Sequence, residues 1–461
     1  MRSFWLCAAL VGGVALLSLS ACSDSSDVGL GVGPDSLEGG QPVTLDVKPD
    51  LDTTHTFPIT GDNARKTPVR NAWRFLVGVV DDPIPGTGVI EAEGYVDFVG
   101  RSTLPSQIAS ASADSLTAEL RLTPSYLHGD SSDAVAVEVY DLTKEATMDS
   151  ARANDTFDAD EMESVSVNAA QITPNDSVVT IKLRQSWIGE NLETLQDTSN
   201  EGGGFENSFH GFKIRAPNSQ AVVGFSSLDA TLRLTYEPDT TIADYSGLKS
   251  FTHIEQRNVT GSPPNTHELL QDGVGVGLTM EWAYGEKEFR EEARNDIPVD
   301  SLPADTGRAL PLNRAEIFVP VDTSTIGDFP EPNFVRPLPN GYRIVATRAS
   351  APDTPSCRAI GLFPLPATNK ACILPLVSSA APTAARVSDN VAFPIFQQSF
   401  RRVRQGKASI FTEYRAHIAD RTSIAGGSTI QTGLPSTLPV LVPVGGDDPG
   451  PPRAILTLTP L

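Results

Sequence analysis

Short stretches in which apolar and polar residues alternate recur along this chain, bounded by Gly, Pro, Asp, Asn and Ser. Alternation over about four to eight residues is typical of β-strands. In the first half the predicted strands are Trp73–Val80, Ile90–Phe98, Ala118–Leu122, Ala134–Tyr140, Val178–Leu183, Gly211–Arg215, Val222–Phe225 and Thr231–Tyr236. In the second half they are Val274–Tyr284, Ala315–Val319, Tyr342–Ala346, Val391–Phe396, Leu438–Val444 and Ala454–Thr459.

The alternation predicts sheets with one apolar and one polar face. In Ala118–Leu122 the three apolar side chains face one way, while Glu119 and Arg121 face the other. Antiparallel sheets of this kind bury the apolar face by packing against a second sheet. We therefore expect a mainly β fold of two tandem antiparallel, jelly-roll-like β-sandwich domains. A transmembrane barrel would show evenly spaced strands with aromatic girdles, and only 7% of the residues are aromatic.

Helical periodicity is sparse. Ser186–Leu195 predicts a short helix with Trp187 on its apolar face. Glu286–Arg294 is too polar to lie in a core, and Phe396–Lys407 is a third, basic candidate. A few short helices are therefore expected beside the sheets.

A weak internal repeat divides the chain. The motif A-x-L-x-L-T occurs at Ala230–Thr235 and again at Ala454–Thr459. An earlier strand that begins with Ala-Glu precedes each copy, at Ala118–Leu122 and Ala315–Val319. Two matches in the same order favour a duplicated sandwich. The expected domains are residues 45–236 and 248–461, joined by a linker at 237–247.

The N-terminus reads as a secretory signal. Arg2 precedes an apolar run over residues 4–19, which is shorter than the roughly 20 residues that a membrane-spanning helix needs. The run ends in Leu19-Ser20-Ala21-Cys22, which resembles a bacterial lipobox. The resemblance implies that residues 1–21 are removed and that Cys22 carries lipid. Ser23 in place of Asp implies the outer membrane, facing either the surface or the periplasm, and 22–44 reads as a flexible tether.

The net charge of the chain disfavours two classes of binding partner. The chain has 35 basic and 57 acidic residues, a net charge of −22. Nucleic acids and anionic lipid surfaces are bound through clustered Lys and Arg, so both are disfavoured as partners. The expected membrane contact is the N-terminal lipid alone.

Cysteine usage predicts one disulfide. Cys7 lies in the signal and Cys22 is the lipid site, which leaves Cys357 and Cys372 in an oxidising compartment. A metal pair or two free thiols are the alternatives. A metal site would need further Cys or His nearby, and none lies between Arg343 and Val391 apart from these two.

The sequence offers few candidate functional residues, and no catalytic motif is found. Asp155, Asp158 and Asp160 lie close together and offer oxygen ligands for a structural Ca²⁺, although such clusters are usually solvated loops. No other cofactor is expected. Trp73, Trp187 and Trp282 would suit a sugar-stacking platform if exposed, and core filling if buried.

Parts of the first half resemble secreted lipoproteins of unknown function in the Bacteroidetes group. The matching segments are Cys22–Gly31, Phe75–Gly86 and the strand ending in Tyr140–Thr143, with Pro85 where that family has an aromatic residue. The closing A-x-L-x-L-T strands resemble the last strand of secreted modules related to carbohydrate-binding domains. The resemblance implies a surface sandwich protein and transfers no catalytic residue.

These observations predict an outer-membrane lipoprotein that acts as a non-enzymatic surface binding or structural module. Its expected partner is polysaccharide or another envelope protein. A secreted hydrolase acting on polysaccharide is the first alternative, and an accessory subunit of an envelope complex is the second.

Overall fold

The computed structural model describes seventeen stretches of the chain, and everything below concerns those residues. They are 42–55, 74–132, 134–144, 153–155, 162–164, 170–172, 177–199, 204–282, 284, 312–325, 333–339, 341–364, 370–377, 383–423, 429–432, 436–445 and 450–458.

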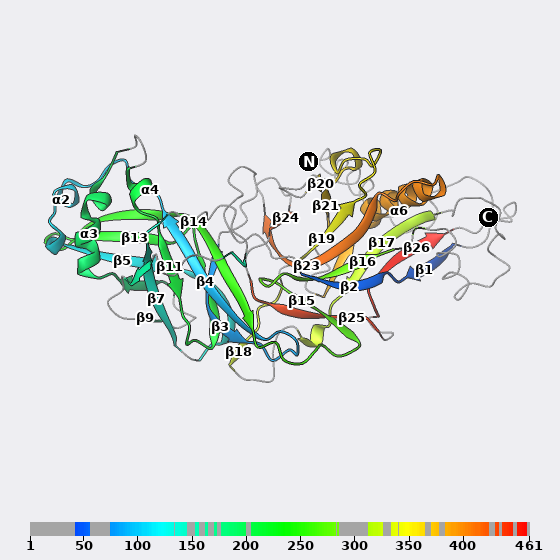
Figure 1. The fold of residues 1–461 in the computed structure, drawn as a ribbon, viewed down its shortest axis with the longest axis horizontal. Coiled ribbons are helices and arrows are strands. Elements are labelled where there is room, and N and C mark those ends of the chain that lie inside the picture. The colour runs from blue at the N-terminus through cyan, green and yellow to red at the C-terminus, as the bar shows by residue number, and fades with distance from the viewer. Residues whose placement is uncertain are drawn as a thin grey trace, which may run out of the picture.

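The fold is mainly β, as predicted, and forms two lobes of antiparallel strands with a few short helices (Figure 1). The first-lobe strands are β3 (Arg74–Asp81), β4 (Val89–Phe98), β5 (Leu116–Leu122), β6 (Pro124–Asp130), β7 (Val135–Leu142), β8 (Met162–Ser164), β9 (Ala170–Ile172), β10 (Val179–Lys182), β11 (Phe212–Arg215), β12 (Ala221–Ser226), β13 (Thr231–Tyr236) and β14 (Thr241–Arg257). The first-lobe α-helices are α2 (Ser106–Ala109), α3 (Gln185–Gln196) and α4 (Gly204–Ser208).

The second lobe combines C-terminal strands with two N-terminal ones. They are β1 (Val43–Val47), β2 (Asp50–His55), β15 (His267–Gln271), β16 (Val276–Glu281), β17 (Leu312–Pro320), β19 (Gly341–Arg348), β20 (Phe363–Pro364), β21 (Ala371–Leu374), β22 (Ala384–Val387), β23 (Phe411–Ser423), β24 (Thr429–Thr432), β25 (Pro439–Pro443) and β26 (Arg453–Leu458). Its α-helix is α6 (Asp389–Arg404), and the short strand β18 (Phe334–Val335) pairs with β6 of the first lobe.

Each lobe is a sandwich with its own apolar core. In the first lobe the layer β10-β5-β13-β14 faces the layer that contains β7, β11, β4, β3 and β12. Alternate side chains of β5, such as Leu120, are buried in one cluster with Val96 and Phe212 of the other layer. In the second lobe Ile317 of β17 and Leu456 of β26 belong to the same core as residues of β16, β19 and β23.

The predicted repeat appears in the strand pairing. β13 includes the first A-x-L-x-L-T copy from Thr231 onward and pairs antiparallel with β5, with Leu232 opposite Leu120. β26 includes the second copy as far as Leu458 and pairs antiparallel with β17, with Leu456 opposite Ala315. In both lobes, therefore, the two repeated segments are neighbours in one sheet.

Two predicted boundaries differ from the structure. The expected linker 237–247 is a turn followed by the start of β14, whose residues pair with β13. β1 and β2, expected at the start of the first sandwich, pair instead with β26 and β16 of the second lobe. The alternation of apolar residues predicts a strand, but it does not specify which sheet the strand joins.

One predicted strand is wrong. Val391–Phe396 lies inside α6, where Ala392, Ile395 and Phe396 are buried against the second core. A short apolar run fits a strand or a buried helix equally well by periodicity. The helix predicted at Ser186–Leu195 is confirmed as α3.

A third apolar cluster joins the lobes. Leu76, Val80 and Ile90 of the first lobe pack with Val276 of β16 and Leu441 of β25 in one buried cluster. The long strands β4 and β14 reach from the first core into this cluster. The two lobes therefore share buried apolar surface at their junction.

Candidate binding site

Several predicted site residues lie outside the described part of the chain. These are the lipid site Cys22, Trp73, and the calcium candidates Asp158 and Asp160. The third calcium candidate, Asp155, is described and exposed. Within the described residues no group of three or more His, Cys, Asp or Glu side chains is arranged to hold a metal ion.

Trp187 and Trp282 are core residues, so of the two alternatives for these tryptophans the structure shows core filling and not a sugar-stacking platform. They are only 3% and 5% exposed. The Trp187 indole N–H donates to Asp141 at 2.8 Å, and that of Trp282 donates to the Val47 carbonyl at 3.2 Å. Buried indoles fill the two lobe cores and find a polar partner for the N–H.

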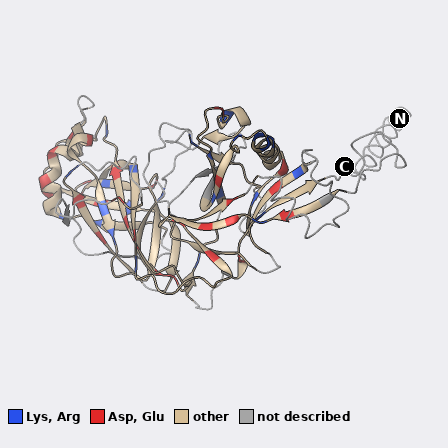
Figure 2. Ribbon diagram, turned by 45° about the vertical axis from the view of Figure 1, so that its right-hand side comes forward, with Lys and Arg blue, Asp and Glu red and all other residues tan. Residues whose placement is uncertain are grey.

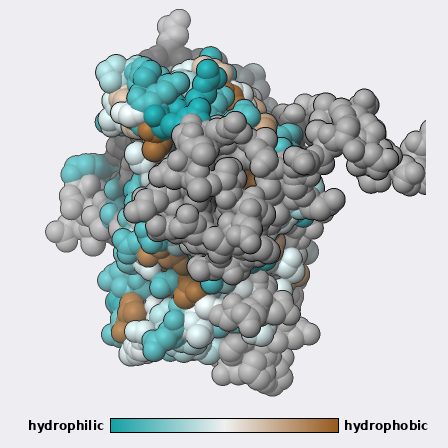
Figure 3. Space-filling view, turned by 90° about the vertical axis from the view of Figure 1, so that its right-hand side faces the viewer, coloured by the Kyte–Doolittle hydropathy of each residue, from teal (hydrophilic) through white to brown (hydrophobic). Residues whose placement is uncertain are grey.

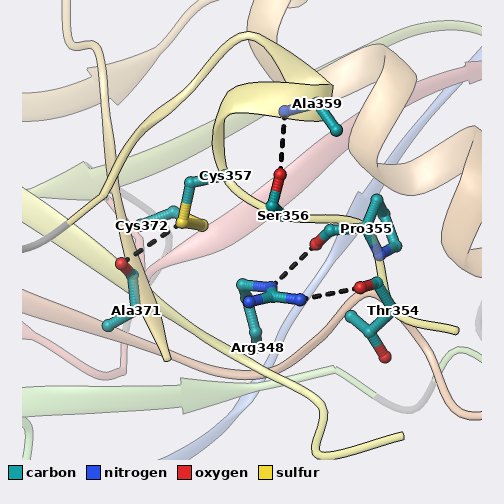
Figure 4. Close-up of a disulfide and its surroundings, with 8 residues drawn as sticks. All are labelled: Arg348, Thr354, Pro355, Ser356, Cys357, Ala359, Ala371 and Cys372. Atoms are coloured by element: carbon teal, nitrogen blue, oxygen red, sulfur yellow. Dashed lines mark hydrogen bonds between the residues drawn. A yellow bond between two sulfur atoms is a disulfide. The ribbon is translucent and has the colours of Figure 1, made fainter. Parts of the chain in front are cut away.

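The predicted disulfide between Cys357 and Cys372 is present, with the two Cα atoms 5.5 Å apart (Figure 4). It joins the short helix before β20 to strand β21 in the second lobe. Nearby, the Arg348 guanidinium donates to the carbonyls of Thr354 and Pro355, both at 2.7 Å. The disulfide and these bonds hold the loop between β19 and β21 on the sheet.

A buried ionic cluster lies at the junction of the lobes. Asp82 follows β3, His128 lies on β6 and Arg336 follows β18, and all three side chains have 0% exposure. Arg336 donates to both carboxylate oxygens of Asp82, at 2.7 and 3.0 Å. His128 Nε2 lies 2.8 Å from Asp82 Oδ2. A paired charge of this kind is tolerated in an interior because each oxygen has charged or polar partners.

The cluster continues into Thr437, which is also fully buried. Thr437 Oγ1 lies 2.7 Å from His128 Nδ1 and 3.3 Å from the Tyr126 hydroxyl. The partners place the ring proton on Nε2, since Asp82 is an acceptor and the Thr437 hydroxyl can donate to Nδ1. Every member of the network then has a partner.

Burial and charge act in opposite directions on Asp82. Burial by itself raises the pKa of the carboxyl group. The hydrogen bond from His128 and the charge of Arg336 outweigh burial and hold the pKa below its usual value. Asp82 is therefore a buried carboxylate. Burial also raises the pKa of the Tyr126 hydroxyl, to about 12.

Asp82, His128 and Thr437 are the residue types of an acid–base–nucleophile relay. Their burial, however, does not suit catalysis. A nucleophile must reach its substrate, and the side chains of all three residues are buried. Arg336 also neutralises the carboxylate that would orient the histidine. The cluster instead fixes four segments, two from each part of the chain, in one arrangement.

A pocket of about 320 Å³ opens beside this cluster. Its lining combines β3, β6 and the segment after β18 with β23 and the residues before β25. The lining residues are Arg74, Ser125, Tyr126, Leu127, Val335, Pro337, Leu338, Pro339, Ile418, Ala419, Ser436 and Leu438. Concave sites of this size at domain junctions are where proteins commonly bind ligands.

The pocket combines apolar side chains with several polar groups. Leu338 and Val335 are 57% and 37% exposed. The Arg74 guanidinium lies over the Tyr126 ring at 5.0 Å, and its Nε donates to the Ser125 hydroxyl at 3.3 Å. Because Arg74 covers one face of Tyr126, the arrangement suits an aliphatic group better than a sugar ring.

Sequence reasoning missed this site. Asp82, His128, Arg336 and Thr437 are far apart in the chain, and each occurs alone in its local segment. The one local signal is the loop Asp82-Pro83-Ile84-Pro85-Gly86, where two prolines predict a rigid turn. Nothing in that loop indicates the partners of Asp82.

No family model matches this chain, and no curated protein matches its sequence. Among the residues that the structure describes, no helix has the length and apolar character needed to cross a bilayer.

Proposed function

We propose that this chain is a lipid-anchored outer-membrane lipoprotein that binds an envelope protein through the junction pocket, without catalysing a reaction. The lipobox-like sequence ending at Cys22 supports the anchor. The pocket carries the binding proposal, because exposed Leu338 and Val335 line a concave site between two lobes that a buried apolar cluster joins. The fully paired Asp82 cluster supports a rigid, non-enzymatic site.

The partner that fits is an extended peptide segment with an apolar side chain. Proline and aliphatic residues dominate the lining, and the pocket volume accommodates one or two side chains. The two described tryptophans that would have favoured polysaccharide are buried in the lobe cores. On the coloured part of the face drawn in Figure 3, hydrophobic residues are exposed among hydrophilic ones.

A peptide-selection experiment tests the binding proposal. Residues 23–461 are immobilised and panned with a displayed library of random extended peptides, and selected peptides are titrated by calorimetry. The expected result is saturable binding of peptides with an aliphatic anchor, weakened about tenfold or more in Leu338→Asp, since burying a Leu side chain is worth roughly 1.5–3 kcal/mol. Phe363→Asp is the matched control, because Phe363 is 63% exposed but does not line the pocket.

Other results would overturn the proposal. The same protein is incubated with a panel of envelope polysaccharides at low and high salt. Saturable binding to one glycan, with no peptide selected, would replace the protein partner with a carbohydrate. Release of reducing sugar would exclude a non-enzymatic role.

The anchor has its own test. Cells that express the full chain are labelled with a palmitate analogue and fractionated. Label and protein are expected together in the outer-membrane fraction, and Cys22→Ser is expected to lose both. Labelling that persists in Cys22→Ser would contradict the assignment of the lipid site.

A further inference from the structure

In each lobe, the segment that begins one of the two repeats pairs with strands of both layers. β14 pairs with β13 over its first part and with β4 over its second part, so it crosses both layers of the first lobe. β1 pairs with β26 and β2 pairs with β16, so the β1–β2 segment crosses both layers of the second lobe. The two segments hold the same place in two similar lobes.

The strand orders support this equivalence. One layer of the first lobe reads β10-β5-β13-β14, and the corresponding layer of the second lobe reads β22-β17-β26-β1. In each case the first strand leads directly into a helix, α3 after β10 and α6 after β22. In the other layer β11 lies between β7 and β4, as β23 lies between β19 and β16.

The two segments also change layers in the same way. The register of β14 shifts between Gly247 and Lys249, where a Cβ on Gly247 would lie 2.1 Å from the Ser227 carbonyl oxygen. The corresponding step from β1 to β2 falls at Lys48 and Pro49. A bulge or a proline interrupts a ladder and lets the strand bend.

The buried side chains of β1 and β14 each belong to the core of the lobe that the strand joins. Leu45 and Val47 of β1 are 2% and 5% exposed and belong to the second-lobe core. Ala243 and Tyr245 of β14 have 0% exposure and belong to the first-lobe core. Each segment therefore supplies apolar surface that its lobe lacks without it.

We infer that the chain is a tandem duplication whose two units have exchanged their leading strands. One unit runs from β1 to β13 and the other from β14 to β26, and each ends in its A-x-L-x-L-T strand. The β1–β2 segment of the first unit closes the second lobe, and β14 of the second unit closes the first. The second lobe consequently completes its sandwich only when residues 43–55 are in place.

A pair of engineered cysteines tests the exchange in the intact protein. Thr44 on β1 and Thr457 on β26 are direct neighbours, with their hydroxyl oxygens 3.4 Å apart. In residues 23–461, Thr44→Cys with Thr457→Cys is expected to form a bond within one chain, detected by non-reducing electrophoresis and peptide mass. Thr44→Cys with Arg233→Cys is the matched control, because Arg233 holds the corresponding place on β13 and is expected to stay unlinked.

Each alternative gives a distinct result. A disulfide-linked dimer from the Thr44–Thr457 pair would show that the strand comes from a second copy. A bond in the Thr44–Arg233 control would place β1 in its own unit. Either result would overturn the exchange within one chain.

Hydrogen exchange gives a second readout. Leu45→Asp is expected to lower amide protection at least tenfold in β16, β17 and β26, while β5 and β7 of the first lobe keep theirs. Ala243→Asp is expected to do the reverse. Loss of protection in the first lobe alone after Leu45→Asp would contradict the inference, and Thr44→Lys, on the exposed face of β1, controls for a general effect of charge.

Discussion

The two lobes have the same strand order, but different interactions stabilise their sheets. The second lobe holds its β19–β21 edge with the Cys357–Cys372 disulfide. The first lobe has its ionic cluster at the junction, where Asp82 follows β3 and is enclosed by His128 and Arg336. Asp272 follows β15 in the corresponding place, where it is partly buried and accepts a hydrogen bond from Ser436. The comparison shows that two aspartates in corresponding places have different partners in the two lobes.

The distribution of charge also differs between the lobes. Acidic residues lie on the helices at the outer end of the first lobe, whereas basic residues lie on α6 in the second lobe (Figure 2). At the end of α6, Arg402 and Lys407 both pair with Asp353, at 3.0 and 2.9 Å. The two lobes therefore share a strand order but differ in the charge on their surfaces.

The largest expected effect tests whether the junction depends on Asp82. Asp82→Ala leaves Arg336 and His128 buried without their carboxylate, which is expected to lower the free energy of unfolding by roughly 3–5 kcal/mol. Asp272→Ala removes two hydrogen bonds, from Ser436 and from the Gly273 amide, and is expected to cost less, roughly 1–3 kcal/mol at about 0.5–1.5 kcal/mol for each bond. Chemical denaturation measures both, with Asp81→Asn on the exposed neighbour of Asp82 as control. Equal losses would remove the proposed asymmetry.

Removing the disulfide sharpens the contrast between lobes. Cys357→Ala with Cys372→Ala opens a loop of 15 residues in sequence separation, and closing such a loop is worth about 3 kcal/mol in the chain-entropy model. Protection against hydrogen exchange is expected to fall in β19, β21 and β23 and to persist in β5 and β7. A reducing agent should reproduce the pattern in the wild type and leave the double variant unchanged.

Acid should weaken the second lobe through His417. Burial, followed by the charges of Arg343 and Arg415, lowers the pKa of His417 to about 3 from the ordinary 6.5. Below about pH 6.5 the unfolded chain takes up a proton that the folded protein does not accept until about pH 3, so stability is lost as the pH falls through this window.

The measurement is the difference between the wild type and His417→Gln. Stability curves at pH 7 and pH 4 should show that the wild type loses more by up to roughly 3 kcal/mol, because one pKa unit corresponds to about 1.4 kcal/mol. His267→Gln serves as the control, because its ring lies 3.4 Å from the Asp322 carboxylate. A wild type that loses no more than His417→Gln between these values would exclude His417 as the acid-sensitive group.

The smallest expected effect concerns the ion pairs that join each exchanged strand to its lobe. Arg233 pairs with Asp244 at 2.7 Å in the first lobe, and Arg453 pairs with Asp46 at 3.0 Å in the second. All four side chains retain some exposure, so each pair is expected to contribute about 0.2–1 kcal/mol. Double-mutant cycles measure the two coupling energies, and a value above about 2 kcal/mol in either lobe would show that polar contacts help to select the strand.

The sequence predicted local structure well where the core imposes an alternating pattern. The strand at Ala118–Leu122 and its repeat at Ala315–Val319 both lie in sandwich cores with alternate residues buried. Trp187 and Trp282 show the limit of such reasoning, because a tryptophan fills a core or binds a ligand with the same local sequence. Residues 43–55 show another limit, since an apolar face on a strand does not identify the partner strand.

The site at the junction of the lobes could not be predicted from the sequence, because its residues are distant along the chain. Asp82, His128, Arg336 and Thr437 meet only after both lobes have formed, and no spacing along the chain relates them. The pocket beside them depends on Leu338 and Ile418, which come from separate elements. A site between two duplicated units becomes visible only in three dimensions.

The pairing of β1 with β26 determines how the molecule would bear a load. Val43 lies opposite Leu458, so the described chain begins and ends in neighbouring strands of one sheet. A pull on residue 42 acts first on the backbone ladder between these two strands, and reaches the first lobe only through the rest of the second. For a protein attached by its N-terminus, the lobe encoded last would therefore be the mechanical base, and the lobe encoded first would be the part held away from the point of attachment.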